Sequence, residues 1–552
     1  MDKTRSSWSL SAPISRRSLL KMGGVAAGAT SLAALTGVRA PFALTAPLST
    51  LQTGTDTLIF AFGTDVDELD PRQIDTQEGY IACANVYDCL VMYDYGATTI
   101  RPGLAERWEI SEDGLEYTFY LRQGVTFHDG TPFNADAVVT WFNSIKEGAP
   151  GSQYDATKMV YMEDFITSKI DRVEKVDDAT VKMILPSPYA PLLANLAIPI
   201  GSIVSPAAIA KGLDEVAVSP SGTGPFMLAK KEDWTRDSQM VLTANPNYWG
   251  GAPKVQRLIF KVVPESSTRL QQLEAGEIDI AWALSTEDIQ RAKKNSELTV
   301  VEQPGLNTNC VELNVSKEPF TKKEVRQALN YAVNREELSD GLYNGDMVPA
   351  GGVLPPVDWA YNPNLRDYDY DPEKAKQLLQ EAGYGEDNPL KFTLMAYTVP
   401  RGYNPAGDRL ATALQEYWKE VGVECEIQTM EWTQYRADRR ANKFVASLSG
   451  WMGDNGDPDN FLYSLLSGDS IGAGNTAWYQ NPEVDRLLKE AQTISDQEQR
   501  KALYQQAEQL IVDDAPWVFL GYQKHQVAIR ANVQNFQLQP TYIYYLVGVS
   551  KS

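Results

Sequence analysis

Histidine is nearly absent from this sequence of 552 residues, and cysteine is scarce. Only two histidines occur, His128 and His525, and they are far apart. The four cysteines are Cys83, Cys89, Cys310 and Cys425. None is in a C-x-x-C pair, so a zinc site built from clustered thiolates and imidazoles is not expected, and we predict neither metal nor cofactor. Two alternatives stay open for the thiols: a disulfide between the last two, or free thiols buried in the core.

Two common motifs for chemistry on phosphates and on peptides are also missing. The sequence has no G-x-x-x-x-G-K-[ST] loop and no H-E-x-x-H helix. Neither histidine has a serine or cysteine partner nearby in the sequence, so a hydrolytic triad has weak support. Carboxylates are plentiful, with 72 Asp and Glu residues. An enzyme that uses carboxylates alone, such as a glycosidase, therefore stays open as an alternative to a binding protein.

Positive charge is in short supply. The formal net charge is -22, which argues against binding to nucleic acid and to anionic membrane surfaces. The acidic balance favours solubility, and an acidic site for a cationic partner is the alternative. Apolar residues make up 43% of the chain and aromatic residues 10%. This length and composition predict packed cores and more than one domain.

The N-terminal segment opposes the acidic trend and is typical of an export signal. Residues 15–21 read SRRSLLK and precede a mildly apolar stretch, residues 22–38, rich in alanine and glycine. The stretch is too short and too weakly hydrophobic to span a membrane stably, and it suits a signal peptide. The arginine pair with the following leucines and lysine resembles the twin-arginine signal, which implies folding before export. We assign residues 1–46 to the signal and its linker, with the cleavage position left open.

The rest of the chain alternates between strand and helix patterns. Residues 57–62 (TLIFAF) predict a buried strand, and residues 115–121 (LEYTFYL) alternate as a half-buried strand does. Residues 81–91 carry apolar residues at helical spacing. Helix starts are marked by Asn334, Asp371 and Asn481, each followed by an acidic residue within the first turn. This mixture predicts an α/β fold.

A series of motifs then identifies a family resemblance. Residues 101–145 contain LAERW (104–108), SEDG (111–114) and FHDG (127–130). Further landmarks are GTGPF (222–226), NPNYW (245–249), GEID (276–279), VRQALNYA (325–332) and YDPEKA (370–375). In this order they resemble family 5 of the extracellular solute-binding proteins, the peptide and nickel class that serves ABC importers. The resemblance covers nearly all of the chain after the signal and implies a protein without enzymatic activity.

The resemblance implies a two-lobed periplasmic-binding-protein fold, type II and cluster C, with an additional third domain. Lobe I is expected from residues 55–95, 222–312 and 520–552. The extra domain is expected from residues 96–221, and the other lobe, lobe III, from residues 313–519. The lobes are expected to close over a ligand by hinge motion and the closed form to dock on the permease subunits of an ABC importer. The protein is expected to act as a monomer on the outer side of the cytoplasmic membrane.

Two later segments resemble the ligand-contacting segments of the dipeptide-binding branch. One contains Arg401 and Tyr403 (residues 399–405, VPRGYNP), and the other spans residues 450–461 (GWMGDNGDPDNF). The resemblance implies that Asp454 binds the α-ammonium of the ligand and that Arg401 binds its α-carboxylate. It also places four more residues at the ligand: Tyr403, Trp451, Met452 and Gly453. The same segment contains Asp457 and Asp459, which we expect to start a helix, while Asp454 is expected at the ligand.

These roles suit a zwitterionic ligand. Enclosing a short peptide strips water from two charges, and each must meet an opposite fixed charge. Arginine offers a planar fork that matches a carboxylate and stays ionised when buried. Gly402 and Ala406 depart from the dipeptide branch, where proline and asparagine are more usual, and they loosen the assignment of the ligand. The alternatives are an oligosaccharide, an opine, glutathione or haem on the same scaffold, while the shortage of histidine counts against nickel.

Overall fold

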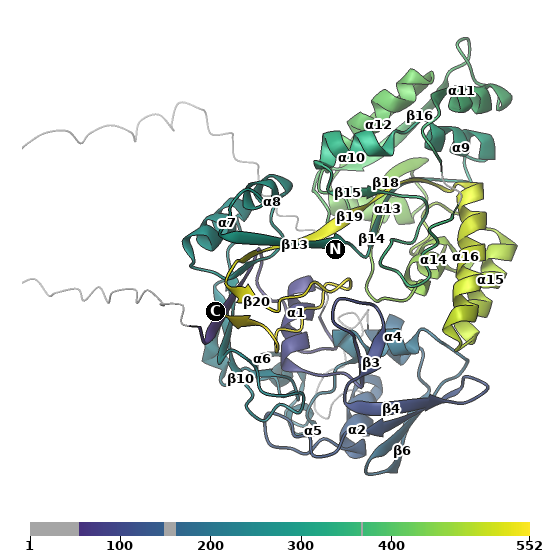
Figure 1. The fold of residues 1–552 in the computed structure, drawn as a ribbon. Helices are drawn as coiled ribbons and strands as arrows, with labels where there is room; N and C mark the ends of the chain where they lie inside the picture. The colour runs from purple at the N-terminus through teal and green to yellow at the C-terminus, as the bar shows by residue number, and fades with distance from the viewer. Residues whose placement is uncertain (1–54, 75, 148–161, 366–367) are drawn as a thin grey trace, which may run out of the picture. The chain divides into compact units, whose positions relative to one another are not determined.

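The computed structural model describes residues 55–74, 76–147, 162–365 and 368–552. The predicted twin-arginine signal lies outside these residues. The described chain holds a 13-stranded sheet, a four-stranded sheet, two two-stranded sheets and the helices around them (Figure 1). The α/β fold predicted from the alternating strand and helix patterns is therefore confirmed. The domain boundaries stay a prediction.

The larger sheet mixes parallel and antiparallel strands. Its order is β17 (Val423–Met430), β16 (Leu390–Tyr397), β18 (Ala446–Met452), β14 (Asn307–Leu313), β19 (Trp517–Arg530), β12 (Ile280–Ala281), β1 (Thr57–Phe62), β11 (Arg257–Val262), β10 (Gln239–Ala244) and β8 (Phe226–Met227). Off this path, β13 (Leu298–Pro304) and β15 (Met347–Pro349) pair with β19, and β9 (Trp234–Thr235) pairs with β10. All six side chains of β1 are buried, as the apolar run predicts.

Strand β19 joins the two halves of this sheet. Its first part pairs with β14, with Phe519 opposite Cys310, and its second part pairs with β13, with Ala528 opposite Val300. Strands β13 and β14 are separated only by residues 305 and 306, so two antiparallel chain segments cross together between the halves (Figure 1). At the crossing, the Asn307 amide accepts from the Gln523 backbone N–H at 2.8 Å and donates to its carbonyl at 2.9 Å.

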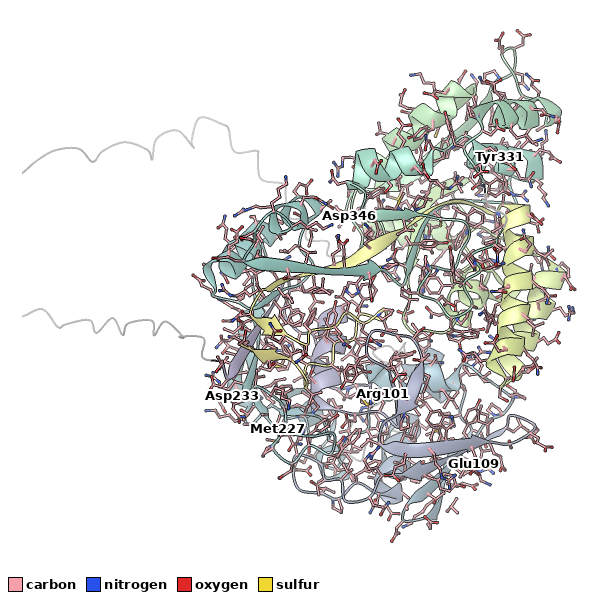
Figure 2. All side chains as sticks on the ribbon, viewed as in Figure 1. Arg101, Glu109, Met227, Asp233, Tyr331 and Asp346 are labelled. Atoms are coloured by element: carbon pink, nitrogen blue, oxygen red, sulfur yellow. The ribbon has the colours of Figure 1, made fainter. Side chains whose placement is uncertain are left out.

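Asp346 contacts residues on both sides of this crossing. It lies in the turn before β15 and accepts hydrogen bonds from Gln290 at 3.0 Å and Gln526 at 2.9 Å, and Lys293 pairs with it at 3.1 Å (Figure 2). Gln290 belongs to α8 (Thr286–Ala292) and Gln526 to β19. One buried carboxylate therefore ties a helix of the β1 half to a turn of the β14 half.

Helices cover both halves of the sheet. The β1 half is accompanied by α1 (Gln77–Val86), α7 (Ser266–Ala275) and α8. The β14 half is accompanied by α9 (Lys323–Tyr331), α10 (Arg335–Tyr343), α11 (Pro372–Glu381), α12 (Arg409–Glu420), α13 (Trp432–Arg440), α14 (Asp459–Leu466), α15 (Pro482–Thr493) and α16 (Gln497–Asp514). Asn334, Asp371 and Asn481 cap α10, α11 and α15 through their side chains, which confirms the predicted helix starts.

A smaller antiparallel sheet stands apart from the large one. Its order is β4 (Ala105–Ile110), β5 (Glu116–Leu121), β7 (Thr180–Ile184) and β6 (Arg172–Asp177). Tyr117, Phe119 and Leu121 are buried and alternate with half-buried residues, which confirms the pattern of this strand. Helix α2 (Ala135–Glu147) contacts β6 and β7. Short helices α4 (Leu192–Leu196), α5 (Pro206–Ile209) and α6 (Leu213–Val218) follow, and two-stranded pairs are formed by β2 (Val91–Tyr93) with β3 (Ile100–Pro102) and by β20 (Val533–Gln534) with β21 (Ser550–Lys551).

Two of the family motifs meet at Asp88. The buried Asp88 carboxylate accepts from the Thr223 hydroxyl at 2.8 Å, the Tyr248 hydroxyl at 3.0 Å and the Trp249 indole at 2.8 Å. Burial raises the pKa of Asp88, and these three hydrogen bonds oppose the rise. Tyr87 is already extended and Asp88 lies among these partners, so α1 ends at Val86 and the prediction of helical structure through residue 91 was wrong.

The four cysteines and His128 occupy structural positions. All four cysteines are unpaired and buried, so the alternative of free thiols holds here. His128 lies against the Gly224 carbonyl at 3.0 Å, as a structural residue would, and burial lowers its pKa to about 4. Over the described ranges, no helix combines the length and apolar character that a bilayer crossing needs. The same residues contain no group of three or more His, Cys, Asp or Glu side chains placed to hold a metal ion.

Replacing Asp88 by alanine should lower the free energy of unfolding by about 2–4 kcal/mol, because three donors lose a buried acceptor. Urea unfolding followed by tryptophan fluorescence measures the change. Glu232→Ala, at an exposed position, serves as the control and should change stability by less than about 0.5 kcal/mol. Equal stability of the two variants would contradict the role of Asp88.

Candidate ligand-binding site

A cavity of about 350 Å³ opens beside the end of β18. One wall comes from the β14 half, with Glu312 of β14, residues 449–451 of β18 and the first two turns of α14. The other wall comes from residues 165–189, with Phe165, Lys169 and Tyr189. The remaining lining residues are Arg439, Arg440, Asp454, Asn455, Leu465, Ser470, Ala473, Gly474, Gln492 and Trp517. The cavity lies between two parts of the chain, and six of its lining residues are charged, so it suits a small polar ligand: Lys169, Glu312, Arg439, Arg440, Asp454 and Asp459.

Asp454 contributes an anion to this cavity. Its backbone N–H donates to Asn460 Oδ1 at 3.1 Å, and Asn460 Nδ2 donates to its carboxylate at 3.4 Å. The indole of Trp451 donates to the same Asn460 oxygen at 2.8 Å. Asn460 thus fixes Trp451 and Asp454 together, and it sits in the first turn of α14, which begins at Asp459 as predicted.

No cation compensates Asp454 among the ion pairs of the described residues. Burial raises the pKa of its carboxyl to about 7, against an ordinary value of 3.8, and the Asn460 hydrogen bond offsets only part of the rise. A carboxylate in this state is stabilised by any cation that enters the cavity.

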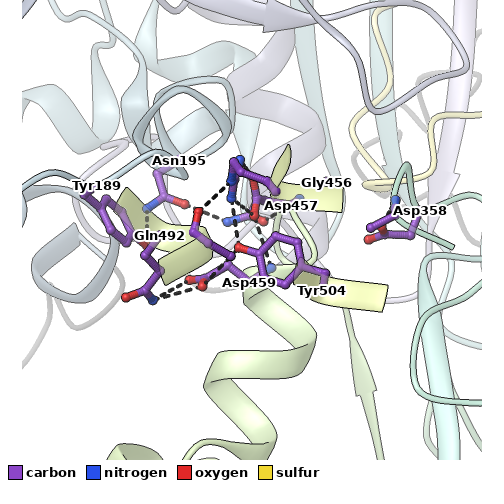
Figure 3. A network of polar contacts seen from close by, with 12 residues as sticks. Tyr189, Asn195, Asp358, Gly456, Asp457, Asp459, Gln492 and Tyr504 are labelled. Atoms are coloured by element: carbon purple, nitrogen blue, oxygen red, sulfur yellow. Dashed lines mark hydrogen bonds and ion pairs between the residues drawn. The ribbon is translucent and has the colours of Figure 1, made fainter. Parts of the chain in front are cut away.

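A second acid lies close by and is held differently. Asp459 accepts from Gln492 Nε2 at 2.9 and 3.2 Å and from the Tyr504 hydroxyl at 3.5 Å (Figure 3). Burial first, and the neighbouring Asp457 second, raise its pKa to about 7. Asp457 itself is paired with Arg500 through two hydrogen bonds of 2.7 and 2.8 Å. Asp454 therefore differs from Asp457 in having no arginine partner.

The loop between β18 and α14 bridges two parts of the chain. Asn455 donates to the Asn195 side chain at 2.6 Å, and the Gly456 N–H donates to the Tyr93 hydroxyl at 2.9 Å (Figure 3). Nearby, the Ala190 N–H donates to the Gln492 carbonyl at 2.7 Å. The segment that presents Asp454 is thus held from both sides of the cavity.

The structure brings the two predicted segments together. A Cβ on Gly450 would lie 2.4 Å from the ring of Tyr403, and a Cβ on Gly402 would lie 3.1 Å from the Met452 sulfur. The guanidinium carbon of Arg401 lies over the Trp432 ring, 4.3 Å from the ring centroid.

Of the six predicted site residues, Trp451 and Asp454 line the cavity. Arg401, Tyr403, Met452 and Gly453 are not among its lining residues. Gly453 instead packs tightly, because a Cβ there would lie 2.8 Å from Leu306. The ligand contacts of all six stay a prediction.

Several lining residues were missed from the sequence. Asn460 lay within the quoted segment but was not singled out. Glu312 and Arg439 come from β14 and the end of α13, far from both predicted segments in the chain. Lys169 and Tyr189 come from the opposite wall. Only the pairing of β14 with β18 and the packing of α13 reveal these neighbours, so no local pattern could have found them.

Ser470 also lines the cavity, in a stretch (GDSIG, residues 468–472) whose letters match the G-x-S-x-G pattern of serine hydrolases. That pattern requires a sharp turn from a strand into a helix. Here the stretch follows α14 and forms a single 3₁₀ turn, Gly468–Ser470. Neither of the two histidines lines the cavity. The Ser470 hydroxyl is bound to the Tyr463 carbonyl at 2.9 Å, as in a structural turn.

Asp454→Asn should stabilise the chain at high pH. The folded state binds the Asp454 proton more tightly than the unfolded state, since its pKa is about 7 when folded and 3.8 ordinarily. The stabilisation from this group is full below pH 3.8 and is lost as the pH rises through 7. The variant should therefore match the parent near pH 4 and exceed it by about 3–4 kcal/mol at pH 8, measured by urea unfolding. A constant difference across this range would contradict the uncompensated charge.

Comparisons with known proteins agree with the fold. The sequence is 38% identical over 470 residues to heme-binding protein A of Haemophilus influenzae, covering 82% of this chain and 85% of the relative. It is 36% identical over 510 residues to the dipeptide-binding protein of Escherichia coli, covering 90% of this chain and 94% of the relative.

Solved structures give the same result. HbpA2 from Haemophilus parasuis superposes with a TM-score of 0.84 at 34% identity, over 90% of this chain and all of that one. DppA from Helicobacter pylori, in complex with the peptide STSA, superposes with a TM-score of 0.72 at 32% identity, over 90% and 98% of the two chains. These matches confirm the periplasmic-binding-protein fold of cluster C with three domains. Residues 99–473 match the bacterial extracellular solute-binding proteins, family 5 Middle. The chain therefore belongs to family 5 of the bacterial extracellular solute-binding proteins, a family of non-enzymatic carriers.

Proposed function

We propose that this solute-binding protein captures a short peptide, and that the α-ammonium of the peptide binds Asp454. The observation that carries the proposal is the Asp454 carboxylate, which lines the cavity, is largely buried and has no cationic partner in the described chain. An ammonium at this position would supply the missing charge and form short hydrogen bonds to the carboxylate. Trp451, fixed by the same asparagine, would form a rigid wall beside it.

Arg401 is proposed to bind the α-carboxylate. Its Nε is buried and has no hydrogen-bond partner among the described residues, and Trp432 supports its guanidinium. The turn that presents it is rigid, because Asn404 is fully buried and bonds to Tyr343 at 2.9 Å and Tyr397 at 3.0 Å. Tyr403 packs against Gly450 of β18, and Met452, the last residue of β18, lies against Gly402 beside this arginine; Gly453 would allow the close approach of the chain at Asp454.

The wider role follows the family. We propose that the protein is exported by the twin-arginine route, binds its peptide outside the cytoplasmic membrane, and delivers it to the permease of an ABC importer. The relatives named as peptide binders, from Escherichia coli and Helicobacter pylori, support this choice of ligand. The paired crossing strands β13–β14 and β19 offer the hinge about which the two walls of the cavity would close.

Di- and tripeptides should raise the melting temperature of the purified protein, since a ligand of the folded state adds RT ln(1 + [L]/Kd) to stability. Ala-Ala and Ala-Ala-Ala are suitable probes. Asp454→Ala and Arg401→Ala should each abolish the rise, while the exposed controls Asp387→Ala and Arg436→Ala should keep it. N-acetyl-Ala-Ala, which has no ammonium, should fail to bind. No shift with peptides of any length would refute the proposal.

Peptide affinity should also depend on pH through Asp454. Binding an ammonium requires the ionised carboxylate, and the pKa of the free protein is about 7. Affinity should therefore fall about tenfold per unit as the pH drops from 6 to 5, where the peptide termini do not titrate. Calorimetry in two buffers of different ionisation enthalpy should count about one proton released at pH 6. No proton release would mean that Asp454 is not the receptor.

Haem is the second candidate. A relative at 38% identity is named heme-binding protein A, and Trp451, Tyr189 and Tyr463 give the cavity aromatic walls. Tyrosine is a known axial ligand of haem iron, and arginine suits its propionates. Asp454 would then face no cation, which is why we rank haem below peptide. A saturable shift of the haem absorbance band, lost in Tyr189→Phe or Tyr463→Phe, would favour it.

A further inference from the structure

Four residues form a polar wall in the cavity, distinct from Asp454. They are Glu312 of β14, Arg439 at the end of α13, Ser449 of β18 and Trp517 at the start of β19. Glu312, Ser449 and Trp517 are buried, and 15% of the Arg439 side chain is exposed. We call this set the Arg439 wall.

The acid of the Arg439 wall already has its partners. Glu312 accepts from the Ser449 hydroxyl at 3.0 Å and from the Thr476 hydroxyl at 2.5 Å. It also lies 3.7 Å from Arg439 in an ion pair. Both carboxylate oxygens are therefore engaged, and the group has little capacity left for a ligand donor.

Two hydrogen-bond donors of the Arg439 wall, in contrast, have no acceptor among the described residues. Arg439 Nη1 donates to Ser449, but Arg439 Nε is buried without a partner among the described residues. The indole Nε1 of Trp517 is likewise buried and unpartnered there. Buried donors without acceptors are rare and costly, so an acceptor group placed in this part of the cavity would be stabilised.

We propose that the Arg439 wall is an anion subsite that binds a carboxylate of the ligand. Arg439 is the receptor, and Glu312 and Ser449 are positioning residues that hold its guanidinium against the wall. A planar guanidinium matches a carboxylate through two parallel hydrogen bonds, which a lysine does not offer. The inference rests on the proposed peptide function and refines its substrate class: one carboxylate enters the same cavity that contains Asp454.

The carboxylate has two possible sources. It is either the α-carboxylate of a peptide short enough to place both ends in this cavity, or an acidic side chain of a peptide whose α-carboxylate reaches Arg401. Four dipeptide probes separate these sources: Ala-Ala, Ala-Ala amide, Glu-Ala and Gln-Ala. Within each pair, the probes differ by a single carboxylate.

The test compares calorimetric affinities of the full chain with those of Arg439→Gln. The variant should lose about tenfold or more in affinity for the probe whose carboxylate it binds, and less than about twofold for the partner that lacks it. Loss for Ala-Ala but not for its amide assigns the α-carboxylate. Loss for Glu-Ala but not for Gln-Ala assigns the side chain. Arg436→Gln, exposed on the same helix and outside the cavity, is the matched control and should change no affinity.

Two outcomes would overturn the inference: an equal loss for all four probes, or no loss for any. Arg439→Lys keeps the positive charge and should retain part of the discrimination, which separates a charge effect from a folding defect seen in the melting temperature. Failure of the proposed function is distinct, because then the parent protein binds none of the probes. If the parent binds peptides and Arg439→Gln does not discriminate among them, the anion subsite alone is wrong.

Discussion

The structure depends on one strand shared by two halves of a sheet. Strand β19 pairs with β14 along its first part and with β13 along its second, so the same 14 residues complete both halves. Separating the halves would break the backbone hydrogen bonds that β19 forms with β14 or those that it forms with β13. The strand ladder is interrupted at residues 305 and 306. There the Gly305 N–H and the side chain of Asn307 both bond to the backbone of Gln523.

This shared strand also explains the composition of the cavity. Glu312 on β14 and Trp517 on β19 reach it because β14 pairs with β18, which ends at Met452, and β19 pairs with the other edge of β14. The charges are unevenly compensated: Asp457 has Arg500, Glu312 has Arg439 and two hydroxyls, and the Asp454 carboxylate has only the Asn460 side chain. Desolvation without a counter-charge is unfavourable, and the fold tolerates it at the residue that resemblance assigns to the ligand.

Much of the fold could be predicted from local signals in the sequence. Side-chain caps at Asn334 and Asp371 mark helix starts because the capping bond forms within one turn. Trp451 and Asp454 were found because the whole segment resembles a family motif. Arg439 and Glu312 were missed because their proximity depends on the packing of α13 and the pairing of β14 with β18. The early end of α1 was missed for the same reason, since Asp88 is held by Thr223 and Tyr248, more than a hundred residues away.

The four free cysteines have a consequence for the life of the protein outside the cell. The thiolate is the form that reacts with oxidants, and burial raises the pKa of all four thiols, so the folded chain holds almost none of it at neutral pH. The folded molecule is therefore protected against oxidation in a compartment that favours disulfides. The vulnerable species is the unfolded chain, in which mispaired disulfides would trap a wrong fold. The fold itself, by burying all four thiols, is what keeps the chain out of this trap.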